Sequence, residues 1–216
     1  MTNEAGQKQT RRRPVTAAAI GSTLIALSAV SAAAARSEIG AGDFYAMANR
    51  YCIRPDGDHP LTWAWAESDG WVVLDPSQFE GLSLPGARQL RGYETVRDGV
   101  RLRILTANNR FRGWNAGITY FNLCWVSAEP FDRQELDEEI RSQLAIPGFR
   151  QEGARVYAWV PLPNGGRRIV GSREFQRRFH AIAREDGMRM LLSNDRQGMV
   201  AATYMKATED CEGWCY

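Results

Sequence analysis

The pattern of apolar and polar residues predicts a chain in which short helices and β-hairpins follow one another. The most strand-like run is ITYFNLCWVS at 118–127, where β-branched and aromatic residues dominate. An Asp-Gly or Asn-Gly pair between two such runs indicates a hairpin turn, because both residues tolerate a positive φ, and Asp98-Gly99 has the spacing of a two-residue turn. Hairpins are therefore predicted around Asp98-Gly99 and Asn164-Gly165, and a third around NDRQG at 194–198.

Helical spacing and capping residues predict three to four short helices. The clearest one follows Asp132, an N-cap residue with Glu135 three positions later, and has Leu136, Ile140 and Leu144 on its inner face. A helix from Ser172 is expected to bury Phe175, Phe179 and Ile182, a helix near Asp43 to bury Phe44, Met47, Ala48 and Tyr51, and a helix at Pro60 to bury Leu61, Ala64 and Trp65.

Helices interspersed with hairpins, rather than strictly alternating with single strands, indicate an α+β fold. We expect a mostly antiparallel sheet of hairpins with the short helices packed on it. Residues 36–216 are long enough for a single domain with a sizeable core. A short similarity between AESDGWVVL at 66–74 and AREDGMRML at 183–191 suggests two related halves, at about 43–128 and 129–208.

The first 35 residues have the order of a bacterial signal peptide. A basic segment at 8–13 precedes a weakly apolar stretch at 20–30, and the small residues at 31–35 offer A-x-A cleavage sites. The chain is thus expected to be periplasmic or secreted, with no membrane span after signal removal. Arg11-Arg12 resembles the start of a Tat signal but Pro14 does not, so both Sec and Tat export stay open. An uncleaved anchor over 15–35 is the alternative interpretation.

The charge of the chain gives no reason to expect a nucleic-acid partner. The whole chain has 27 basic and 25 acidic residues, of which four basic and one acidic lie in 1–35. The remainder has 23 basic and 24 acidic residues and a net charge of −1. A nearly neutral domain lacks the long-range attraction to phosphate that nucleic-acid binding requires.

Four cysteines, Cys52, Cys124, Cys211 and Cys215, remain after the signal segment. An even number in an exported chain predicts disulfides. Three pairings are open, and we favour Cys52–Cys124 with Cys211–Cys215, because the two tail cysteines are close in sequence. The alternative joins a tail cysteine to the body of the domain. A thiol redox pair is a weaker interpretation of Cys211 and Cys215, since their C-x-x-x-C spacing differs from the usual C-x-x-C.

Several of these features together resemble uncharacterised exported proteins of proteobacteria. The features are Cys52 before a helix, Gly70-Trp71, the hairpins, LCWV at 123–126 and a helix with an acidic start, over residues 40–145. Those proteins have no assigned activity, so the resemblance implies no catalytic residues.

One segment, RRIVGSREFQRRFHAIARED, contains a candidate binding surface. On a regular helix from Ser172, the residues Arg173, Arg177, His180 and Arg184 share one face and form a basic stripe. Guanidinium groups bind oxyanions in a bidentate manner, so the stripe is a candidate site for a small anionic ligand or an acidic partner. The alternative is a solvated face whose arginines pair with neighbouring carboxylates.

A second cluster, Asp56, Asp58 and His59, indicates a turn and a helix cap, and less strongly a cation or catalytic site. The sequence has no G-x-S-x-G, Walker, G-x-G-x-x-G or H-E-x-x-H motif. Cofactors and bound metals are not expected.

These observations favour an exported, non-catalytic protein that binds an unknown envelope component or a small anionic ligand. The main alternative is a small exported hydrolase that uses His180 or His59 with a carboxylate. A thiol redox protein using Cys211 and Cys215 is the weaker alternative.

Overall fold

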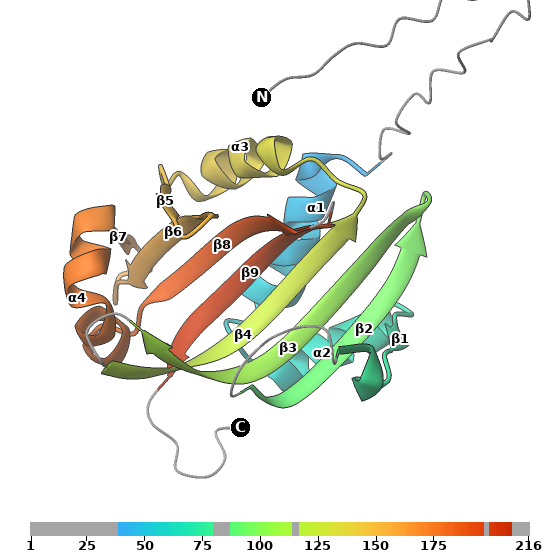
Figure 1. Ribbon diagram of the computed structural model, residues 1–216, viewed down its shortest axis with the longest axis horizontal. Helices are drawn as coiled ribbons and strands as arrows, with labels where there is room; N and C mark the ends of the chain where they lie inside the picture. Colours follow the sequence, from blue (N-terminus) through green and yellow to red (C-terminus); the bar gives the residue numbers. More distant parts are fainter. Residues whose placement is uncertain (1–38, 80–86, 114–116, 197–198, 209–216) are drawn as a thin grey trace, which may run out of the picture. The chain divides into compact units, whose positions relative to one another are not determined.

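The computed structural model describes residues 39–79, 87–113, 117–196 and 199–208, which all belong to one compact unit within 36–216 (Figure 1). The helical elements are α1 (Ala41–Ala48), the π-helix η1 (Asn49–Ile53), α2 (His59–Ser68), the 3-10 helix η2 (Pro76–Phe79), α3 (Arg133–Leu144) and α4 (Ser172–Glu185). The strands are β1 (Val72–Val73), β2 (Arg88–Arg97), β3 (Val100–Gly113), β4 (Gly117–Glu129), β5 (Phe149–Gln151), β6 (Ala154–Pro161), β7 (Arg167–Val170), β8 (Arg189–Arg196) and β9 (Met199–Thr208).

All these strands join one nine-stranded sheet with the order β1-β2-β3-β4-β9-β8-β6-β5, and β7 pairs with β6. Every strand pair is antiparallel, which confirms a mostly antiparallel α+β fold. The sheet is more than a set of hairpins, however, because β4 pairs with β9 and β6 with β8 across long stretches of chain. These pairings cover hairpin edges that would otherwise leave backbone groups unpaired.

The local predictions with clear turn and cap chemistry are confirmed. β2 and β3 flank the two-residue turn Asp98-Gly99, and β8 pairs with β9. β6 and β7 also form a hairpin, but Asn164-Gly165 lies within a longer loop, 162–166, because Pro161 pairs with Arg167. Helix α3 starts after Asp132, whose carboxylate accepts a 2.7 Å hydrogen bond from the Gln134 backbone N–H. Its inner residues are the expected ones, and all three are buried.

Other helix and strand predictions need correction. Helix α1 follows Gly40, so Asp43 lies in the first turn and accepts from the Gly40 N–H at 3.4 Å instead of being the N-cap. Helix α4 likewise has Gly171 as its N-cap. Helix α2 begins where expected but buries His59, Thr62 and Ala66 rather than the predicted face, since Leu61 is 36% exposed. Of the apolar run GWVVLD at 70–75, only the two residues of β1 form a strand.

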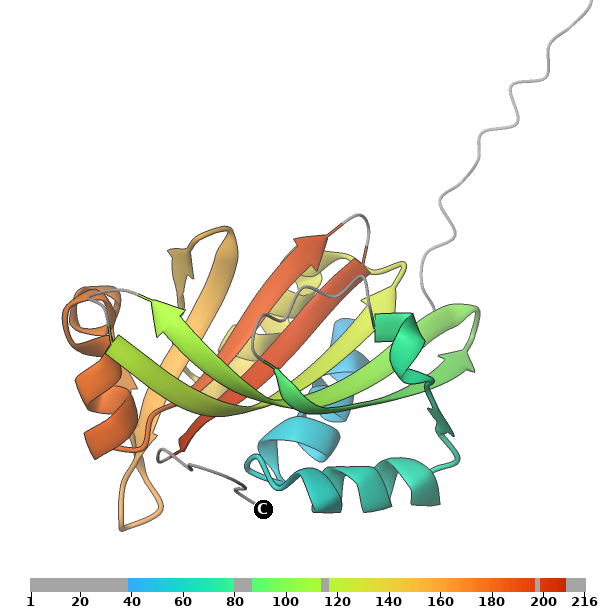
Figure 2. The same cartoon turned by 60° about the horizontal axis from the view of Figure 1, so that its bottom comes forward.

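The two faces of the sheet carry separate apolar clusters, and the four α-helices are divided between them. Figure 2 shows the sheet as a curved layer with α1 and α2 on one side. On this helix face, Cys124 and Val126 of β4 join the cluster that also contains Leu136 of α3. On the opposite face, Leu123 and Trp125 of β4 join the cluster that contains Phe175 of α4. The period-2 alternation of β4 thus supplies both clusters.

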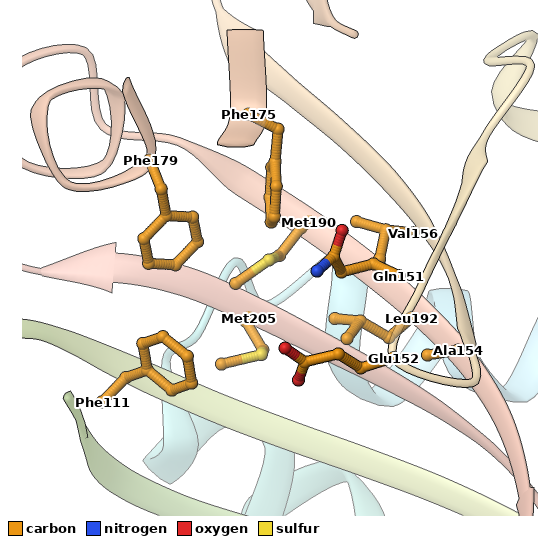
Figure 3. Close-up of a pocket in the computed structure, with 10 residues that line it drawn as sticks. All are labelled: Phe111, Gln151, Glu152, Ala154, Val156, Phe175, Phe179, Met190, Leu192 and Met205. Atoms are coloured by element: carbon orange, nitrogen blue, oxygen red, sulfur yellow. The ribbon is translucent and has the colours of Figure 1, made fainter. Parts of the chain in front are cut away.

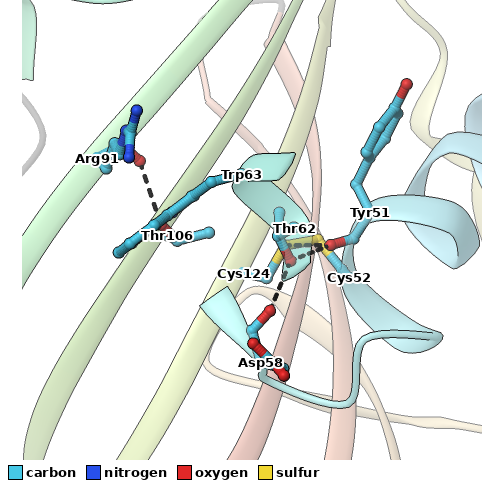
Figure 4. The surroundings of a disulfide bond; sticks show 8 residues. All are labelled: Tyr51, Cys52, Asp58, Thr62, Trp63, Arg91, Thr106 and Cys124. Carbon is cyan, nitrogen blue, oxygen red and sulfur yellow. Dashed lines mark hydrogen bonds between the residues drawn. A yellow bond between two sulfur atoms is a disulfide. The ribbon is translucent and has the colours of Figure 1, made fainter. Parts of the chain in front are cut away.

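The Cys52–Cys124 disulfide connects η1 to the central strand β4 on the helix face (Figure 4). Its surroundings are fixed by hydrogen bonds, because the Thr62 hydroxyl contacts the Tyr51 carbonyl at 2.7 Å and the Asp58 carbonyl at 3.2 Å. This pairing is the one favoured from the sequence. Cys211 and Cys215 lie outside the described residues, so their pairing stays a prediction.

Candidate functional site

An apolar pocket of about 180 Å³ lies between α4 and the face of the sheet opposite α1, α2 and α3 (Figure 3). It is formed by side chains from β3, β5, β6, α4, β8 and β9, together with the turn that follows β5. The residues that line it are Phe111, Gln151, Glu152, Ala154, Val156, Phe175, Phe179, Met190, Leu192 and Met205.

The pairing of residues between β6, β8 and β9 determines which side chains form the floor of the pocket. Met190 and Met205 are direct partners in the β8–β9 pair, and Val156 and Leu192 are direct partners in the β6–β8 pair. Direct partners in an antiparallel pair project from the same face, so these four side chains form one continuous patch. Two of them are thioethers, which are unbranched, polarizable and able to adapt to an irregular ligand.

Aromatic rings from α4 and β3 form the wall. The ring centroids of Phe175 and Phe179 are 5.0 Å apart, and the Phe111 ring meets Phe179 edge-on at 5.5 Å. Between the two helix residues, Arg178 has a non-helical backbone (φ −129°, ψ 17°), which kinks α4 one residue before Phe179. Both phenylalanines are nevertheless buried, as expected for the inner face of this helix.

The rim of the pocket is polar on one side. Gln151 is the last residue of β5, and Glu152 belongs to the turn to β6, where Glu152 has a φ of 47° and Gly153 a φ of 85°. Figure 3 shows the Gln151 amide and the Glu152 carboxylate directed toward the cavity. The Gln151 side-chain oxygen also accepts from Gln176 of α4 at 3.3 Å. The pocket therefore combines an apolar body with one hydrogen-bonding edge, the usual composition of a small-molecule site.

His180 anchors α4 beside this pocket. Its Nδ1 lies 2.6 Å from the hydroxyl of Thr119, a β4 residue that is 1% exposed. The imidazole also packs so closely on β4 that a Cβ atom at Gly117 would lie 2.4 Å from His180 Cδ2. The absence of a side chain at Gly117 thus allows this helix to approach the strand.

We expect Gly117→Ala to destabilise the protein by about 1–3 kcal/mol, because the added methyl group overpacks the contact with His180. Urea unfolding of the wild type and the variant measures this change. In a His180→Ala background, which lacks the imidazole ring, Gly117→Ala should cost much less stability than it does in the wild type. If the cost is the same with and without the imidazole, the close approach is not its cause.

The predicted basic stripe on α4 is divided by the kink. Arg173 and Arg177 precede Arg178, while His180 and Arg184 follow it. The three arginines are exposed, whereas the half-buried His180 is directed to Thr119. The stripe as an anion or partner site stays a prediction, and its histidine contributes to packing.

His59 occupies a different environment from that of a typical catalytic histidine. It is the first residue of α2, is 4% exposed, and its Nε2 is buried without a hydrogen-bond partner within the described part of the chain. Burial lowers the pKa of the imidazole to about 4, against the opposing effects of a backbone hydrogen bond to Leu123 and of Asp58. A solvent-accessible pair of His59 and a carboxylate is not present in this arrangement.

The acidic residues next to His59 have structural partners. Asp58 caps α2 by accepting from the Leu61 N–H at 3.0 Å. Asp56 forms a two-point ion pair with Arg189 (2.6 and 2.8 Å) and contacts Lys206 at 3.0 Å and the Tyr204 hydroxyl at 2.5 Å. These bonds outweigh burial and lower the pKa of Asp56 to about 2. Asp58 is thus a helix cap, whereas the Asp56 carboxylate holds an ion pair with residues of β8 and β9.

Within the ranges that the structure describes, no group of three His, Cys, Asp or Glu side chains could hold a metal ion. No helix in the same ranges combines the length and apolarity needed to cross a membrane.

The apolar pocket was not predicted from the sequence. Its signal is the apolar character of successive residues in β8 and β9, such as Met190-Leu191-Leu192, which indicates a sheet buried on both faces. The sequence does not show which side chains leave a cavity, because that depends on how α4 is placed.

Comparison of the chain with protein families, with curated proteins and with solved structures found no match.

Proposed function

We propose that the protein is an exported, non-catalytic binding protein that holds the apolar group of a small ligand in the pocket between α4 and the sheet. The pocket itself carries this proposal. An engineered apolar cavity of about 150 Å³ in another protein binds benzene. At about 180 Å³, this pocket has room for one aromatic ring or a short alkyl chain.

A binding role is favoured over hydrolysis by the chemistry of the lining. Among the described residues that line the cavity, Glu152 is the one with an ionisable side chain, and it stands at the rim. Acid–base or nucleophilic catalysis needs a second group that orients or activates the first. The rim is better suited to accepting a hydrogen bond from a ligand whose apolar end is buried.

The exported location rests on the signal-like first 35 residues and on the cysteine content. The Cys52–Cys124 disulfide is compatible with an oxidising compartment such as the periplasm or the exterior. A component of the cell envelope with an aromatic or alkyl end is the kind of ligand that such a protein would meet there.

Benzene, toluene and 1-hexanol are expected to bind in this pocket, which ¹³C-methyl methionine NMR can detect. Met190 and Met205 line the cavity. Met47 of α1 belongs to the apolar cluster on the other face of the sheet and serves as an internal reference. Saturable shifts are expected at the two pocket methionines and not at Met47. Equal shifts of the methyl signals of all three methionines, or no shift at millimolar concentrations of the probe, would refute the proposal.

A variant that narrows the pocket completes this test. Ala154→Leu places a larger side chain at the lining and should weaken probe binding at least tenfold, or about 1.4 kcal/mol. Ala154→Ser is the matched control, because it changes the same position with little added bulk. An unchanged Met47 signal in both variants would show that the fold is retained.

A further inference from the structure

A second pocket, distinct from the apolar one, lies between α3 and the β5–β6 pair and is lined mainly by charged side chains. Its volume is about 380 Å³. The lining residues are Arg133, Gln134, Asp137, Glu138, Arg141, Arg150 and Arg155. Four guanidinium groups face two carboxylates here, so positive charge is in excess. We call this group the arginine pocket.

The strand register places two of these arginines opposite each other. Arg150 of β5 and Arg155 of β6 are direct partners in an antiparallel pair, so their side chains leave the same face of the sheet. Like charges in this relation destabilise a sheet unless an anion lies nearby. The neighbouring residues Ala154 and Val156 point to the apolar pocket instead, which places Arg155 on the helix face, toward α3.

The carboxylate at the centre of the arginine pocket compensates only part of this charge. Asp137 Oδ2 lies 3.3 Å from Arg155 Nε and 3.8 Å from Arg133 Nε, both longer than a charge-assisted hydrogen bond of about 2.8 Å. Its other oxygen accepts from the hydroxyl of Ser193. Arg155 Nε is buried and forms no hydrogen bond within the described chain. The donor capacity of this guanidinium is therefore not fully used.

The remaining charges do not restore the balance. Arg133 also lies 3.5 Å from Asp195 of β8, and Glu138 is hydrogen-bonded to Gln134 at 3.3 Å. Arg141 and Arg150 are exposed and have no ion pair among the residues described. Even with Asp195 counted, four cations face three carboxylates.

We propose that the arginine pocket binds a tetrahedral dianion, namely phosphate or the phosphomonoester group of a ligand. The guanidinium donors come from three elements, α3, β5 and β6. Donors that approach from several sides suit a tetrahedral anion, whose oxygens point in three dimensions, better than they suit a planar carboxylate. An anion also brings negative charge to the side of the pocket where Arg150 and Arg155 face each other. This site is independent of the apolar pocket and lies away from the basic stripe predicted on α4.

Isothermal titration with inorganic phosphate at constant ionic strength tests the proposal on the wild-type protein. Arg150→Gln removes one of the two facing arginines from an exposed position, so the fold should be retained. Loss of a charge-assisted contact is expected to weaken phosphate binding by about tenfold to a hundredfold. Arg141→Gln should weaken it similarly, and acetate should bind more weakly than phosphate.

Arg184→Gln is the matched control, because it removes the same charge from an exposed arginine on α4. Its phosphate affinity should stay within about twofold of the wild type, since long-range charge effects are small in salt. Equal losses in Arg150→Gln and Arg184→Gln, or a loss only in Arg184→Gln, would overturn the site. Absence of phosphate binding up to about 10 mM would do the same.

A sedimentation assay separates two sources of the phosphomonoester. Vesicles of phosphatidylcholine with phosphatidic acid should pull down the wild type, but not Arg150→Gln, if the group belongs to a lipid headgroup. Phosphate binding that depends on Arg150 without sedimentation would assign the site to a soluble phosphate compound.

Discussion

Removing the Cys52–Cys124 disulfide is expected to lower the free energy of unfolding by about 4 kcal/mol. The two cysteines are separated by 72 residues, and closing a loop of this length restricts the unfolded chain strongly in the chain-entropy description. Both residues are 1% exposed, so Cys52→Ala/Cys124→Ala leaves small apolar side chains in an apolar site. For a chain of this size, the melting temperature should fall by about 10 °C.

Urea unfolding under oxidising conditions measures this effect, and a second pair of cysteines supplies the control. Cys211→Ala/Cys215→Ala should cost at most about 2 kcal/mol, because a disulfide between them would close only a short loop. Reductant should destabilise the wild type strongly and the Cys52→Ala/Cys124→Ala variant only weakly. If the Cys52→Ala/Cys124→Ala variant is as stable as the wild type, this bond does not restrict the unfolded state.

The parts of the fold that could be predicted are those governed by local chemistry. Asp98-Gly99 and Asn164-Gly165 define their hairpins because the backbone at such turns needs positive φ, and Gly99 and Gly165 indeed have φ of 76° and 77°. Asp132 and the spacing of Leu136 and Ile140 define α3 in a similar way. Each of these signals lies within a few neighbouring residues.

The parts that could not be predicted depend on residues distant in sequence. Helix α2 buries Thr62 rather than Leu61, because the Thr62 hydroxyl has a carbonyl partner on η1. The α4 stripe assumed a regular helix, whereas the kink at Arg178 and the contact of His180 with Thr119 change that face. Neither contact follows from periodicity.

Both candidate sites depend in the same way on the register of one strand. In β6, Ala154 and Val156 line the apolar pocket, while Arg155 between them lines the arginine pocket on the other face. A one-residue change in pairing would exchange these faces. Which residue faces which pocket is set by the pairing of β6 with β5 and β8, and the sequence of β6 alone does not contain that information.

Lowering the pH from 7 to 4 is expected to cost the protein about 3 kcal/mol of stability through His59 alone. Burial lowers the pKa of this imidazole from 6.5 to about 4, because a cation would be held at a nearly inaccessible position at the start of α2. Above pH 6.5 the histidine is neutral in both the folded and the unfolded chain. As the pH falls from 6.5 toward 4, the unfolded chain takes up a proton that the folded chain does not, so stability falls through this window.

Urea unfolding at pH 7, 5.5 and 4 for the wild type, His59→Asn and His180→Asn isolates this contribution. The asparagine amide can replace the donor to the Leu123 backbone but does not titrate, so the His59→Asn variant should show a much smaller loss between pH 7 and 4. His180→Asn should retain the full loss, because His59 is still present. The ion pairs of Asp56 do not interfere, since their contribution is lost mainly below pH 4, toward the carboxyl pKa of about 2. Parallel losses in the wild type and His59→Asn would show that this imidazole is not the group whose protonation opposes folding.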